Sequence, residues 1–71
     1  GIKMSIVSSY ALKDKKCISV NIYSIDAAVI LHDFLIKAAS KGMEEGKFFE
    51  AEVALHNANE LTAAMEEAFE L

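Results

Sequence analysis

The apolar residues follow one pattern in the first part of the chain and another in the rest. Residues 5–12 and 17–24, SIVSSYAL and CISVNIYS, contain β-branched and aromatic residues that alternate with polar ones, and the polar stretch KDKK separates them. This pattern is typical of two strands joined by a turn. From residue 25 onward the apolar residues recur every three or four positions, which indicates helices.

The alternation also predicts how the two strands pair. If Leu12 pairs with Cys17, the apolar side chains are divided between both faces of the hairpin. If Leu12 pairs with Ile18, one face collects Ile6, Ser8, Tyr10, Leu12, Ile18, Val20 and Ile22. A slip of one residue would move each side chain of a strand to the opposite face. We therefore expect the second register, with a five-residue connection or a bulge ending at Cys17.

Two helices are predicted after the strands. Ser24 is suited to be the N-cap of the first helix, and Asp26 would place a carboxylate in its first turn. This helix covers about residues 25–42 if Gly42 ends it, or it continues to Glu45 and turns at Gly46. A second helix is expected over about residues 47–70. Its apolar stripe consists of Phe48, Ala51, Leu55, Ala58, Thr62, Met65 and Phe69.

Residues 46–61, GKFFEAEVALHNANEL, resemble the turn and second helix of a tetratricopeptide repeat. Gly46 stands at the turn, Phe48 at the aromatic position, and Ala51 and Ala58 at the small packing positions. Gly42 departs from the pattern, because a bulky residue is expected there. A lone repeat cannot build a solenoid, so the resemblance implies a helical hairpin that turns near Gly46, and no particular function.

These elements predict an α+β fold, in which an N-terminal β-hairpin (about residues 5–24) is followed by an antiparallel αα-hairpin (ββαα). Residues 4–71 would form a single domain. Residues 1–3 precede Met4, the first methionine, and we interpret them as a cloning remnant.

The sequence also predicts self-association. Ten of the thirteen residues in AAVILHDFLIKAA (27–39) are apolar, and one hairpin and one helix cannot cover them all. The single cysteine, Cys17, excludes an internal disulfide, and a lone two-stranded hairpin leaves both of its edges open. We therefore expect a homodimer or higher oligomer whose hairpins pair across protomers. The predicted helical interface residues are Val29, Ile30, Phe34, Leu35 and Ile36.

The net charge of −4 is distributed unevenly along the chain. Residues 1–41 carry +3 and residues 42–71 carry −7, and there is no arginine. This balance disfavours nucleic-acid binding and is compatible with a basic partner or with mimicry of a nucleic acid. The predicted acidic partner surface consists of Glu52, Glu60, Glu66 and Glu67. The alternative is that these glutamates form only a solvated helix face.

Polar residues within and just before the apolar helix are candidate contacts for a ligand or partner. They are Tyr23, His32, Asp33 and Lys37. The alternative is that His32, Asp33 and Lys37 mark the narrow strip of the helix that faces solvent, with an ion pair between Asp33 and Lys37 at i,i+4.

Candidate catalytic and metal sites are weak. Glu52, His56 and Glu60 have helical spacing that suits a divalent metal, but such sets arise freely in a glutamate-rich segment. Cys17 has lysine neighbours but no base nearby in the sequence. No phosphate-binding loop or hydrolase motif is present. We expect neither enzymatic activity nor a bound metal or cofactor.

The expected function is therefore that of a small acidic interaction module. No secretory pattern or membrane-spanning run is recognisable, so we expect a cytoplasmic protein without a membrane partner. By analogy of class, small acidic proteins include phage and mobile-element products that inhibit host enzymes, which makes inhibition of a protein partner one expected role. The alternative is a small-ligand-binding protein whose pocket forms at the oligomer interface.

Overall fold

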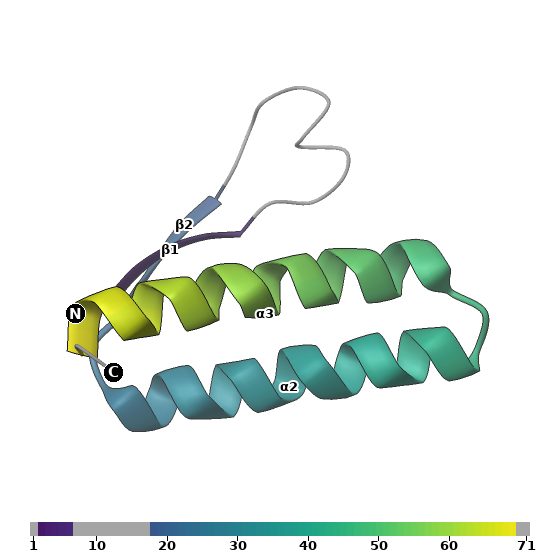
Figure 1. Ribbon diagram of the computed structural model, residues 1–71, viewed down its shortest axis with the longest axis horizontal. Coiled ribbons are helices and arrows are strands. Elements are labelled where there is room, and N and C mark those ends of the chain that lie inside the picture. The colour runs from purple at the N-terminus through teal and green to yellow at the C-terminus, as the bar shows by residue number, and fades with distance from the viewer. Residues whose placement is uncertain (1, 7–17, 70–71) are drawn as a thin grey trace.

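The protein is mostly helical over residues 2–6 and 18–69, which are the residues that the computed structural model describes. Its elements in chain order are strands β1 (Ile2–Ile6) and β2 (Ile18–Ile22), then helices α2 (Ile25–Glu44) and α3 (Phe48–Phe69). The helices lie side by side in opposite directions, and the strands lie behind them near the end where α2 begins (Figure 1). The predicted helical hairpin is therefore confirmed.

Helix α2 begins at the predicted residue. The backbone of Ser24 is extended (φ −141°, ψ 150°), and its hydroxyl oxygen accepts a hydrogen bond of 3.1 Å from the backbone N–H of Ala27. This bond satisfies one of the N–H groups that the first helical turn leaves without a partner. Asp26 lies in that first turn, where the helix dipole favours a negative charge.

The turn between the helices is closed by two hydrogen bonds around Gly46. The backbone N–H of Lys47 donates to the carbonyl of Gly42 at 2.7 Å, and that of Gly46 donates to the carbonyl of Met43 at 3.3 Å. This pattern is a Schellman motif, in which the residue after the cap adopts a left-handed conformation. Gly46 has φ 74°. Of the two predicted ends of the first helix, the structure thus supports the turn at Gly46.

Gly42 is a buried residue within α2 and has a different role. A Cβ atom built on it would lie 3.0 Å from the Cβ of Ala51 and 3.1 Å from the backbone nitrogen of Ala51 and the carbonyl oxygen of Lys47. Real Cβ atoms seldom come so close to their neighbours. Gly42 therefore allows α3 to pass close to α2 directly after the turn.

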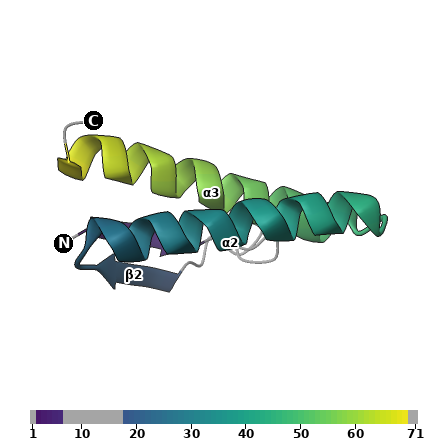
Figure 2. The same cartoon turned by 90° about the horizontal axis from the view of Figure 1, so that it is seen from below.

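The hydrophobic core lies at the opposite end of the helix pair, where the strands are. Strand β1 lies against α3, and β2 lies against α2. Ile22, Ala28 and Leu61 form the buried centre of this core. Partly buried apolar residues pack around it: Val20, Leu31, Leu35, Ala64, Met65 and Phe69. Neither strand of the described residues extends to the turn end (Figure 2), where α2 and α3 approach each other closely.

The register of the strands differs from the prediction. Ile18 pairs with Ile6, not with Leu12, and Ile22 pairs with Ile2 in the antiparallel ladder. The predicted and observed registers differ by six residues, and because this shift is an even number, the alternation of apolar and polar residues cannot distinguish them. The predicted connection, residues 13–17, lies outside the described residues. Ile2 and Lys3, interpreted above as a remnant, belong to β1.

Candidate functional site

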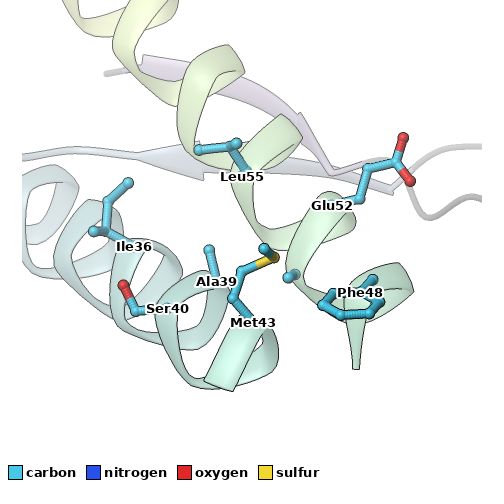
Figure 3. A pocket seen from close by; sticks show the side chains of 8 residues that line it. Ile36, Ala39, Ser40, Met43, Phe48, Glu52 and Leu55 are labelled. Carbon is cyan, nitrogen blue, oxygen red and sulfur yellow. The ribbon is translucent and has the colours of Figure 1, made fainter. Parts of the chain in front are cut away.

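A groove of about 390 Å³ opens between α2 and α3 on the side that faces away from the strands. Figure 3 looks into this groove, with the strands in the background. We call this side of the helix pair the front face. The groove is lined by Ile36, Ala39, Ser40, Met43, Phe48, Ala51, Glu52 and Leu55.

The spacing of large apolar residues explains the groove. Residues seven apart lie almost directly above one another on a helix, and this spacing relates Val29, Ile36 and Met43 on α2. The same spacing relates Phe48 and Leu55 on α3. All five are exposed, and together we call them the apolar floor.

Two residues of the apolar floor correct a prediction. Phe48 and Leu55 were expected in the packed stripe of the second helix, but they are 62% and 49% exposed. Ala51 and Ala58, from the same stripe, are buried. The reason is that α2 packs against the alanines, whose small side chains allow close approach, and the larger side chains at the edge of the stripe are left on the front face.

A second hollow of about 260 Å³ continues along the front face toward the start of α2. It is lined by Val29, His32, Thr62, Met65 and Glu66. Val29 and Met43 lie 14 residues apart on α2, which corresponds to about 21 Å of helix length. The front face is thus an elongated apolar surface.

Carboxylates border this surface on both sides. Asp33 follows Asp26 by 7 residues and Glu44 follows Asp33 by 11 residues. These spacings are close to two and three full turns, so the three residues follow one line along α2. Glu52 and Glu66, 14 residues apart, follow a corresponding line along α3. All five side chains are exposed. We call these two lines the acidic rims.

The structure separates the predicted interface residues into three groups. Val29 and Ile36 lie on the front face. Ile30 and Phe34 are 56% and 65% exposed and lie on a different side of α2, at least 100° around the helix from the front-face pair. We call this pair the outer flank. Leu35 is partly buried and packs against the core.

The predicted polar contacts are not brought together either. His32 is partly buried and lines the second hollow, whereas Tyr23, Asp33 and Lys37 are exposed and line neither hollow. Within the described residues, the predicted Asp33–Lys37 ion pair does not form; the one salt bridge there joins Lys47 to Glu45 at 3.5 Å. Both of those side chains are exposed, so this bridge contributes little to stability.

The acidic surface predicted from sequence divides as well. Glu52 and Glu66 belong to the front face, while Glu67 and Glu60 are exposed about 100° and 120° around α3 from Glu66. Met43 is not among the site residues predicted from the sequence, and Phe48 and Leu55 are predicted in the packed stripe of the second helix. The seven-residue spacing of Val29, Ile36 and Met43 is the signal that would have identified Met43.

The chemistry of the groove suits docking of an apolar surface. Among its described lining residues, Ser40 and Glu52 are the polar ones, and the lining contains no imidazole that could activate a serine. Across residues 2–6 and 18–69, no three histidine, cysteine or carboxylate side chains, Glu52, His56 and Glu60 included, are placed to hold a metal ion. Neither α2 nor α3, the helices of the described chain, is long and apolar enough to cross a membrane.

Comparisons with protein-family models, with curated proteins and with solved structures found no match to this chain. The groove, the apolar floor and the acidic rims are therefore the observations from which a function is argued.

Proposed function

We propose that this chain is a small protein-interaction module, not an enzyme, and that its front face docks a helical segment of a protein partner. The apolar floor carries this proposal, because it exposes five large apolar side chains along both helices. Apolar surfaces of this kind on small proteins are typical of docking sites. A groove between two helices suits the apolar ridge of a third.

The proposal is tested by using the wild type and two variants, Phe48→Glu and Phe34→Glu, as baits and comparing the proteins that each bait retains. We expect the Phe48→Glu variant to lose a partner that the wild type retains, because it places a charge in the apolar floor. The matched control is Phe34→Glu, an equally exposed phenylalanine on the outer flank, which should retain that partner. Quantitative mass spectrometry of the captured proteins is the measurement. Identical capture by all three baits would contradict docking on the front face.

Self-association remains part of the proposal, and it is assigned to other surfaces. The described sheet consists of two strands, so each has an edge that the other does not cover. Because β2 lies against α2, strand pairing between two copies along β2 would bring their α2 helices side by side. The exposed Ile30 and Phe34 of the outer flank would then meet their counterparts.

We expect the wild type to sediment as a dimer at about 100 μM and to dissociate on dilution, because this interface is small. Replacing both Ile30 and Phe34 with glutamate should weaken the dimer at least about tenfold, since like charges would face each other at its centre. Phe48→Glu is the control and should leave the dimer intact. Sedimentation velocity measures the oligomeric state of the wild type and both variants. A wild type that is monomeric at about 100 μM would rule out self-association.

A small apolar ligand is the second candidate occupant of the front face. The volume of the groove, about 390 Å³, lies within the usual range for such sites. However, Tyr23 and Asp33, two of the contacts predicted for a ligand, do not line it. A protein partner therefore accounts better for the elongated apolar surface. Cytoplasmic location and inhibition of the partner remain proposals that rest on composition.

A further inference from the structure

The charges around the groove specify the kind of partner, on the basis of the docking role proposed above. We infer that the occupant of the front face is a basic amphipathic helix. Its apolar residues would contact the apolar floor, and its lysines or arginines, on both sides of that stripe, would reach the two acidic rims.

The first argument is the sign of the charge on both sides of the groove. Asp26, Asp33 and Glu44 follow one side, and Glu52 and Glu66 follow the other. Helix α3 carries five glutamates and no lysine or arginine. Lys37 is the base closest to the rim of α2 and lies slightly further from the groove. A helix in the groove would therefore meet carboxylates on both flanks, which favours basic residues there.

The second argument is the match in length and pattern. The apolar surface from Val29 to Met43 is about 21 Å long, which corresponds to about 14 residues, or four turns, of a partner helix. A helix with apolar residues at spacings of three and four presents one stripe to such a groove. Its flanking residues then lie on either side of the stripe, opposite the two rims.

A second copy of the chain fits this surface poorly. If two front faces met with their helices aligned, parallel or antiparallel, the acidic rims of one copy would lie against those of the other. Like charges placed opposite one another across an interface oppose association. This is why self-association is assigned above to the strand edge and the outer flank.

The test uses three synthetic peptides of about 18 residues, enough to span the groove. The first has leucines at spacings of three and four with lysines on both sides. The second replaces each lysine with glutamate, and the third contains the residues of the first in scrambled order. Fluorescence anisotropy measures their binding to the full chain. We expect the first peptide to bind at least about tenfold more tightly than the others. Its affinity should fall as the salt concentration rises from about 50 to about 300 mM.

Matched variants separate the rims from general acidity. Replacing Glu52 and Glu66 with glutamine should lower the affinity for the basic peptide about threefold to tenfold, because two exposed charge pairs are lost. Replacing Glu60 and Glu67, on the outward side of α3, with glutamine removes the same amount of charge. It should change the dissociation constant of the basic peptide less than about twofold. Phe48→Ser should weaken binding at least about tenfold by removing part of the apolar floor. Circular dichroism of each variant confirms that it is folded.

The outcomes distinguish this inference from the proposed function. If all three peptides bind equally and Phe48→Ser weakens them all, the front face docks apolar segments but the inference about charge is wrong. Equal effects of the rim and outward glutamine variants would also overturn it. If no peptide binds and Phe48→Glu abolishes dimerisation, the occupant is a second copy and the inference fails. If no peptide binds and capture by the three baits is identical, both proposals fail.

Discussion

Replacing Leu61 with alanine is expected to lower the free energy of unfolding by about 3 kcal/mol. Leu61 is the largest fully buried side chain of the described residues, with 0% exposure, and it lies in the cluster with Ile22 and Ala28. Truncation would remove apolar contacts and leave a cavity that the surrounding strands and helices fill only in part. Small domains have limited stability, so this loss is a large fraction of the total.

The control for this prediction is Leu55→Ala, the same substitution six residues earlier in α3. Leu55 is on the front face, and its truncation should cost less than about 1 kcal/mol because water already reaches much of the side chain. Urea denaturation, monitored by circular dichroism at a fixed protein concentration, measures the free energy of unfolding of both variants. Similar losses for the two variants would show that the core is not centred on Leu61.

The second large effect is expected for Gly42→Leu, at about 2–3 kcal/mol of destabilisation. Even a Cβ atom at Gly42 would be 3.0–3.1 Å from atoms of Ala51 and Lys47, two of which are backbone atoms. A full leucine side chain would force α3 away from α2 at the turn. The gain in helix propensity on replacing glycine, about 1 kcal/mol, offsets only part of this cost.

Lys41→Leu is the matched control for Gly42→Leu. Lys41 precedes Gly42 in α2 but is exposed, so the new side chain would extend into solvent. We expect a change within about 0.5 kcal/mol. Thermal and urea denaturation of both variants provide the comparison. A Gly42→Leu variant as stable as the wild type would show that α2 and α3 do not approach closely at this point.

The local features of the fold could be predicted from sequence. The sequence predicts Ser24 as the N-cap and Gly46 as one of two possible turns, because capping and left-handed backbone depend on a few adjacent residues. Gly42 could not be assigned in this way. A glycine can end a helix or allow close packing, and only the position of Ala51 in space decides between the two. The register of β1 and β2 could not be predicted either, because a shift by an even number of residues preserves the alternation of apolar and polar positions.

The candidate site was less predictable, for a geometric reason. The sequence shows that α2 has more apolar residues than its neighbours can cover, but it does not show which sides of α2 face β2 and α3. Once those positions are known, the interface residues separate into Val29 and Ile36 on the front face, Ile30 and Phe34 on the outer flank, and Leu35 in the core. For the same reason, the exposure of Phe48 and Leu55 depends on where α2 crosses the alanines of α3.

The arrangement of the core has a consequence for synthesis of the chain. Strand β1 (Ile2–Ile6) is synthesised well before α3 (Phe48–Phe69), yet the two lie against each other in the fold. The helices are connected by a short turn and can pair as soon as α3 emerges, because closing a short loop costs little entropy. Strand β1 must therefore wait until α3 has been translated before it can pack. A ribosome-bound chain that stops before Leu61 would therefore lack the core that anchors its own N-terminal strand.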